Sequence, residues 1–162
     1  MSGAEDLGPW GVPVRVHEPG RLVTADAGRV HVTRYVDVIT LELAHQAEAD
    51  YLEFCQEIGG RVPVMMISER VVPLPPVEVR RFWREAARKE PGYEAVALLM
   101  TGVVGLMAAA ATHLGEQLVE VLGVRFRSFK QPADAARWLC EAANCGLEHE
   151  ELAQRIVDVQ SL

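Results

Sequence analysis

The chain has 162 residues, a length that fits one domain, and its 49% of hydrophobic residues suffices for a packed core. A net charge of −7 argues against nucleic acid as the main partner, because phosphate backbones bind to clustered cations. The three cysteines have neither disulfide-framework spacing nor the two-residue spacing of a zinc knuckle or redox pair, so reduced thiols in a cytoplasmic protein are expected.

Neither the first residues nor the longest apolar stretch indicates a membrane protein. Met1 to Asp6 is small and acidic rather than basic and then apolar, so we expect no signal peptide. Residues 95–114 are interrupted by Thr101, two glycines and His113. They predict a strand, a turn and a helix rather than a membrane span.

The first third of the chain predicts strands and then one helix. After a loose end over residues 1–10, apolar residues alternate over 12–16, and two further strand-like runs, 21–25 and 29–35, flank a hairpin turn at 26–28. Thr40 is typical of a helix N-cap, and Gly59-Gly60 follows the helix that it begins. The remaining elements alternate: a strand at 62–67, a helix at 77–89, a strand at 95–100, a helix at 103–121, a strand at 124–129, a helix from 132 and a last helix at 152–159.

Strands that alternate with helices favour an α/β fold with a mixed, largely parallel sheet, crossover helices and an N-terminal β-hairpin. We expect a single domain over residues 11–143 and a C-terminal helical extension over 144–162. That extension either folds back onto the domain or exchanges with a second subunit in a homodimer.

Three segments carry a resemblance to a known family: VRFRSFKQPADAARWL from Val124, VPVMMIS from Val62 and EAVALLMTG from Glu94. Over roughly Arg29 to Ala143 the chain resembles the STAS-like domain of anti-sigma factor antagonists and their bacterial relatives. The resemblance implies a non-enzymatic, regulatory, protein-binding module of the bacterial cytoplasm. It also implies an alternative, a binding protein for a small apolar or lipid-like ligand.

The regulatory members of that family carry a phosphorylatable serine in an Asp-Ser-Ser-Gly-like motif after a central strand. Here the corresponding segment is ISERVVPLPP, from Ile67, in which Ser68 has neither the preceding acid nor the following glycine. Ser68 is therefore a candidate phosphorylation site with a simpler alternative, an ordinary serine at the end of a strand.

The sequence lacks the common catalytic and cofactor motifs. The chain contains no Walker A loop, no Gly-x-Ser-x-Gly elbow and no closely spaced histidine pair. Glu53 and Glu57 stand one helical turn apart, but a solvated helix face explains them more simply than acid–base chemistry. We assign no catalytic residue, no metal and no cofactor, and an enzyme without a recognisable motif remains a further alternative.

The expected helix over 77–89 carries a basic face, since three arginines are spaced by three and four residues: Arg81, Arg84 and Arg88. An apolar loop that includes Leu74 precedes it. These four residues are predicted to bind an acidic partner or an anionic ligand. The alternative is a solvated face whose arginines pair with Glu78 and Glu85. For the small-ligand hypothesis, the lining of the pocket is predicted to be Phe82, Trp83, Leu106 and Met107.

Overall fold

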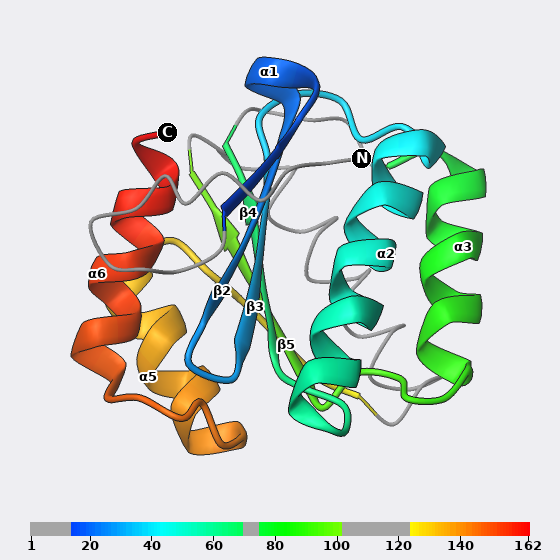
Figure 1. Ribbon diagram of the computed structural model, residues 1–162. Coiled ribbons are helices and arrows are strands. Elements are labelled where there is room, and N and C mark those ends of the chain that lie inside the picture. The colour runs from blue at the N-terminus through cyan, green and yellow to red at the C-terminus, as the bar shows by residue number, and fades with distance from the viewer. Residues whose placement is uncertain (1–13, 70–74, 102–123) are drawn as a thin grey trace.

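The computed structural model describes residues 14–69, 75–101 and 124–162. In these ranges a six-stranded sheet lies between α2 and α3 on one face and α5 and α6 on the other (Figure 1). The strands are β1 (Val14–His17), β2 (Leu22–Ala27), β3 (Val30–Tyr35), β4 (Val64–Ser68), β5 (Ala95–Met100) and β6 (Arg125–Phe129). The helices are α1 (Glu18–Arg21), α2 (Leu41–Ile58), α3 (Val77–Arg88), α5 (Pro132–Ala142) and α6 (His149–Gln160).

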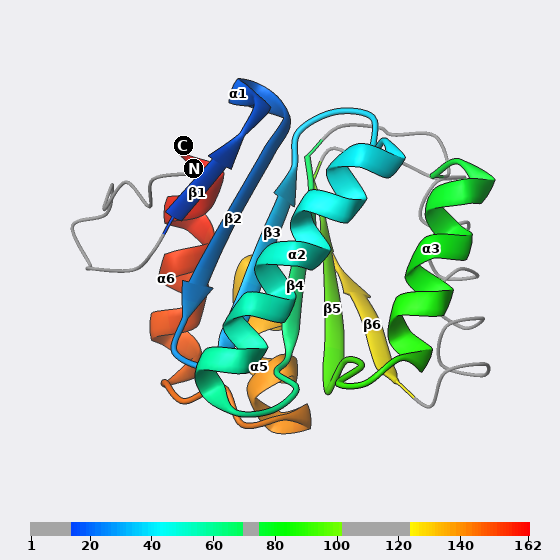
Figure 2. The same ribbon diagram turned by 45° about the vertical axis from the view of Figure 1, so that its right-hand side comes forward.

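The strands follow one another across the sheet in chain order, as Figure 2 shows. β1, β2 and β3 are antiparallel neighbours, whereas β3, β4, β5 and β6 run parallel. The predicted α/β fold, with a mixed and largely parallel sheet and an N-terminal hairpin, is thus confirmed. The hairpin turn lies later than predicted, because Asp26 and Ala27 belong to β2 and Ala27 pairs with Val30.

Helix α2 begins and ends as its sequence predicts. The Thr40 hydroxyl accepts a hydrogen bond from the amide of Leu43, which satisfies one of the free donors of the first turn. Gly59 adopts a left-handed conformation, with φ of +86°, and its amide donates to the carbonyl of Cys55. These two caps fix the length of the helix and therefore which of its residues face the sheet.

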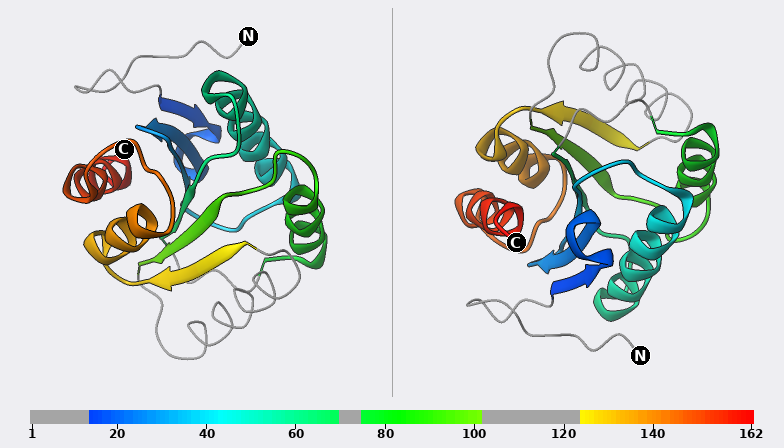
Figure 3. Two further views of the ribbon diagram at one scale, coloured as in Figure 1. Left: turned by 90° about the horizontal axis from the view of Figure 1, so that it is seen from below. Right: turned by 90° about the horizontal axis from the view of Figure 1, so that it is seen from above.

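The α5 and α6 face of the sheet has an apolar core, and both helices contribute to it. Figure 3 shows the two helices side by side on this face. Alternate residues of the strands point into this core because successive side chains of a strand face opposite ways. Leu152 and Ile156 of α6 are fully buried in it. The C-terminal segment therefore folds back onto its own domain and completes the core.

The face of the sheet under α2 and α3 has an apolar part and a polar part. Under α3 and the N-terminal part of α2, apolar side chains such as Leu22, Tyr35 and Val79 form a small cluster. Under the middle of α2, the hairpin instead presents buried polar side chains, which form the site described below. The helix predicted over 103–121 lies outside the described residues. Within the described ranges, no helix combines the length and the apolarity that a bilayer crossing requires.

Candidate functional site

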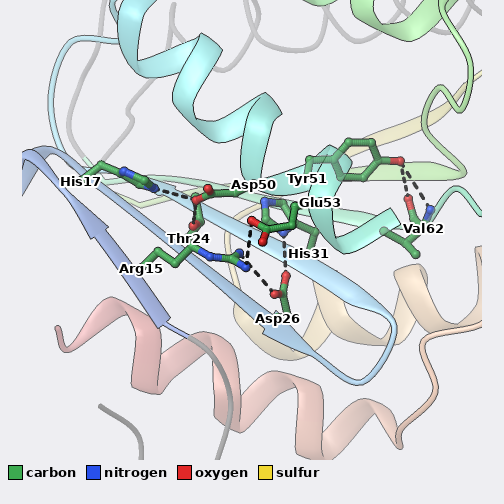
Figure 4. Close-up of polar contacts among 9 residues, drawn as sticks. All are labelled: Arg15, His17, Thr24, Asp26, His31, Asp50, Tyr51, Glu53 and Val62. Atoms are coloured by element: carbon green, nitrogen blue, oxygen red, sulfur yellow. Dashed lines mark hydrogen bonds and ion pairs between the residues drawn. The ribbon is translucent and has the colours of Figure 1, made fainter. Parts of the chain in front are cut away.

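Polar side chains fill the space between the β1–β2–β3 hairpin region and α2 (Figure 4). Those from the strands occupy positions that face α2, while their neighbours in sequence face the apolar core on the other side, and α2 contributes Asp50 and Glu53. Two groups of contacts make up this polar layer, one centred on Asp50 and one on Asp26. Its members are Arg15, His17, Thr24, Asp26, His31, Asp50 and Glu53.

Asp50 of α2 holds the first group together. One of its carboxylate oxygens, Oδ2, lies 2.6 Å from Nε2 of His17 on β1 and also accepts a hydrogen bond from the hydroxyl of Thr24 on β2. A carboxylate only accepts hydrogen bonds, so the His17 ring donates through Nε2. The helix is thus attached to two strands of the hairpin region through a single oxygen.

Asp26 holds the second group. It pairs across the hairpin with His31, whose Nδ1 lies 2.7 Å from Oδ1 of Asp26. The Arg15 guanidinium lies 3.5 Å from the other oxygen of Asp26 and 3.5 Å from the carboxylate of Glu53. Through these two ion pairs Arg15 links β1 to both β2 and α2. The His31 ring also packs edge-on against Tyr51, with 5.7 Å between ring centroids.

The burial of this layer limits what it can do chemically. Thr24, Asp26 and His31 are 0%, 5% and 1% exposed. Among the described residues, Oδ2 of Asp26, Nη1 of Arg15 and Nε2 of His31 have no hydrogen-bond partner. Because a substrate must reach a catalytic group, these side chains are suited to joining α2 to the strands and not to turnover in this conformation. Their effect is on stability and on the uniqueness of the packing.

Sequence reasoning missed this layer, although a signal was present. Asp50 falls on the same helical face as Ala47, Tyr51 and Phe54. Because that face packs on the sheet, the Asp50 carboxylate must face the sheet as well. Polar residues also alternate with apolar ones in both hairpin strands, a pattern typical of strands with one polar face. Because α2 packs over that polar face, its side chains are buried.

A second set of polar contacts joins Glu48 and Tyr51 of α2 to the residues that precede β5. The Tyr51 hydroxyl donates to the carbonyl of Gly92 at 2.6 Å, and the Tyr93 hydroxyl donates to Oε2 of Glu48 at 2.6 Å. Burial raises the pKa of Glu48 above its usual range, while the bond from Tyr93 acts in the opposite direction. These contacts tie the loop between α3 and β5 to α2.

The predicted basic face of α3 is present as a surface. Arg81, Arg84 and Arg88 are exposed, on the side of the helix opposite the buried Val79. Within the described ranges no carboxylate lies at ion-pair distance from any of the three, so the pairing with Glu78 and Glu85 considered from the sequence is not made. We call this surface, with Val77, the arginine face.

The aromatic residues predicted to line a ligand pocket pack against neighbouring elements. Phe82 lies 4.2 Å from the His45 ring of α2, centroid to centroid, and Trp83 lies 6.4 Å from the ring of Tyr35 on β3. Both are half-buried. The other residues of the predicted pocket, Leu106 and Met107, and the predicted partner-binding residue Leu74 lie outside the described residues.

Ser68 ends β4, as the sequence predicts, and its side chain is half-buried. Its carbonyl accepts the amide of Thr101 at 3.0 Å, which ties the end of β4 to the end of β5. The next residue, Glu69, pairs with Arg34 at 2.8 Å. Glu57 is exposed, and Glu53 is 60% exposed although it pairs with Arg15 at the edge of the polar layer.

No family model, no curated protein and no solved structure matches this chain. Within the described ranges, no three metal-ligating side chains gather in one place. The assignment of a function therefore depends on the surfaces and contacts described above.

Proposed function

We propose that this protein is a non-enzymatic interaction module of the STAS-like type in a bacterial cytoplasm. It docks an acidic segment of a partner protein on the arginine face of α3. The chain order of the sheet, with a hairpin followed by strand–helix crossovers, supports the STAS-like assignment. The free state of all three cysteines supports a reducing compartment.

The observation that carries this proposal is the arginine face itself. Three guanidinium groups project from one side of a helix in an acidic protein, and none has a carboxylate partner among the described residues. Beside them Val77 is 59% exposed, the highest value among the exposed large hydrophobic residues described. Arginine is enriched in interfaces and binds carboxylates through two parallel hydrogen bonds.

The chemistry of the partner follows from the charges. Unpaired guanidinium groups favour carboxylates, and Val77 favours an apolar contact next to them. Arg81, Arg84 and Arg88 follow Val77 at intervals of four, three and four residues, so all four share one stripe along the helix. An extended or helical segment that alternates acidic and apolar residues matches this stripe.

The experiment is site-specific photo-crosslinking in the organism that encodes the protein. A photoreactive residue replaces Glu85, which is exposed and adjoins the arginine face. We expect a crosslinked partner whose contact peptide is rich in Asp and Glu. Arg81→Glu with Arg84→Glu should abolish the crosslink without changing the melting temperature, because exposed positions contribute little to stability.

The matched control reverses two exposed cations elsewhere, Arg61→Glu with Lys130→Glu, and so gives the same net charge. This variant should still crosslink. If both variants crosslink equally, or if the contact peptide is not acidic, the arginine face is not the docking surface. A substrate turned over by the purified protein would contradict the non-enzymatic assignment.

A further inference from the structure

Two cysteines that are separated by four residues in the sequence meet in space. Cys140 lies in the last turn of α5, and Cys145 lies in the linker to α6. The linker reverses at Gly146, which has a φ of +70° and donates its amide to the side chain of Asn144 at 3.0 Å. The reversal brings both cysteines to the lining of one pocket, and Cys140 packs against the apolar cluster that contains Cys145. Their spacing in the sequence did not predict this contact.

The backbone around Cys145 is held in place by the hairpin. The carbonyl of Cys145 accepts the amide of Arg29 at 2.7 Å, and the carbonyl of Asn144 accepts the Arg29 guanidinium at 3.0 Å. Gly28, beside Arg29, approaches so closely that a Cβ there would lie 2.5 Å from the Cys145 carbonyl oxygen. Cys145 is therefore positioned before any reaction takes place.

The two thiols differ in their access to solvent. Both line a surface pocket of about 480 Å³ at the junction of α5 and α6, together with Arg137, Glu148 and His149. Cys140 is half-buried, and its thiol faces the carbonyl of Leu147 at 3.9 Å. Cys145 is only 3% exposed and packs into the apolar core. A reagent that enters the pocket meets Cys140 first.

We propose that Cys140 and Cys145 form a dithiol–disulfide site that exchanges with low-molecular-weight disulfides. The Cys140 thiolate attacks one sulfur of the reagent disulfide, which forms a mixed disulfide and releases one reagent thiolate. The Cys145 thiolate then attacks the Cys140 sulfur and displaces the second reagent thiolate. The protein loses two protons and two electrons to the reagent, which is reduced to two thiols.

The surroundings of the thiols set the pH at which the site reacts. Burial is the main reason why the pKa of each thiol lies above its usual range. Charged and titratable groups surround the pair: Arg137 and Glu141 from α5, Glu148, His149 and Glu150 at the start of α6, and Glu94 and Arg29 from the sheet side. Glu148 and Glu150 raise the pKa of Cys140, Glu94 raises that of Cys145, and Arg29 lowers that of Cys145. The exchange rate should therefore rise about tenfold per pH unit between pH 7 and 9, since only the thiolate attacks.

The test uses the full-length protein and 5,5′-dithiobis(2-nitrobenzoate), an aromatic disulfide whose released thiolate is coloured. For the native wild type we expect two thiolates released per chain and no retained adduct, with a protein mass lower by two hydrogen atoms. Cys145→Ser should release one thiolate and retain the adduct on Cys140. Cys55, on the buried side of α2, should react only after unfolding.

A peptide map separates this result from a folding defect in the variant. Both cysteines lie in one tryptic peptide, Trp138 to Arg155, because no lysine or arginine stands between them. After the reaction the wild-type peptide should resist alkylation until it is reduced. A stable aromatic adduct on wild-type Cys140, or alkylation of both cysteines in the treated native protein, would overturn the proposal.

Discussion

Oδ2 of Asp50, in the middle of α2, lies 2.6 Å from Nε2 of His17 on β1, the edge strand of the sheet. The same oxygen accepts the hydroxyl of Thr24 on β2. Helix α2 is thus attached to the hairpin region by polar contacts, whereas α5 and α6 are attached to the other face of the sheet by apolar packing.

Replacing Asp50 should be strongly destabilising. Asp50→Ala removes the acceptor for Thr24, which is fully buried, and for His17, so two donors lose their partner. We expect the free energy of unfolding to fall by about 2–4 kcal/mol, as is usual when one member of a buried polar pair is removed. Urea denaturation followed by circular dichroism measures it. Glu57→Ala, on the exposed side of the same helix, should stay within about 0.5 kcal/mol of wild type.

The hydroxyl of Tyr51 should contribute measurably to stability. Tyr51→Phe keeps the ring and its contact with His31 but leaves the carbonyl of Gly92 without its 2.6 Å donor. A loss of about 1–2 kcal/mol in the free energy of unfolding is expected for a buried acceptor without a donor. Thermal denaturation and urea denaturation should both show this loss. An unchanged midpoint would mean that water replaces the hydroxyl at Gly92.

Gly28 should tolerate no side chain. It has a φ of +59°, and an added Cβ would lie 2.5 Å from the backbone oxygen of Cys145. Gly59 also has a positive φ, but nothing lies within 4 Å of its added Cβ. Gly59→Ala should therefore show only the backbone penalty of about 1 kcal/mol, and Gly28→Ala should exceed it by about 2 kcal/mol in the free energy of unfolding. Equal losses would show that the linker moves freely away from the hairpin.

Glu48 should make stability depend on pH in a defined direction. Burial raises its pKa above the ordinary 4.5, so the folded state holds a proton that the unfolded state has released. This contribution is fully present below the unfolded pKa and is lost as the pH rises through the raised value. Glu48→Gln keeps an acceptor for Tyr93 and removes the titration.

The variant should therefore gain stability relative to wild type as the pH rises from 4 to 7, measured by urea denaturation at each pH. At the acid end the two proteins should be nearly equal. A constant difference at every pH would show that Glu48 does not titrate differently in the folded and unfolded states.

The fold could be predicted from periodicity and caps, because those signals are local. Thr40 and Gly59-Gly60 indicate where α2 begins and ends, and the apolar run at 62–67 predicts the central strand β4. The hairpin turn was misplaced because Asp26 favours turns, yet here His31 and Arg15 provide partners that keep it in a strand. Tertiary partners of that kind are invisible in the local sequence.

The candidate sites also differ in whether the local sequence could predict them. The arginine face could be predicted because one helix carries all of it. The polar layer and the thiol pair could not, since each joins residues from elements that only the fold brings together. His17 and Asp50 are 33 residues apart, and the contact of Cys145 with Cys140 depends on the reversal at Gly146.

The alternation of polar and apolar residues in β2 and β3 also distinguishes the native hairpin from a misfolded one. If β2 slipped by one position against the sheet, Thr24 and Asp26 would turn into the apolar core beneath α5 and α6, without partners. An all-apolar hairpin would carry no such penalty and would tolerate several alignments. The buried polar side chains of β2 therefore act against wrong strand pairing during folding.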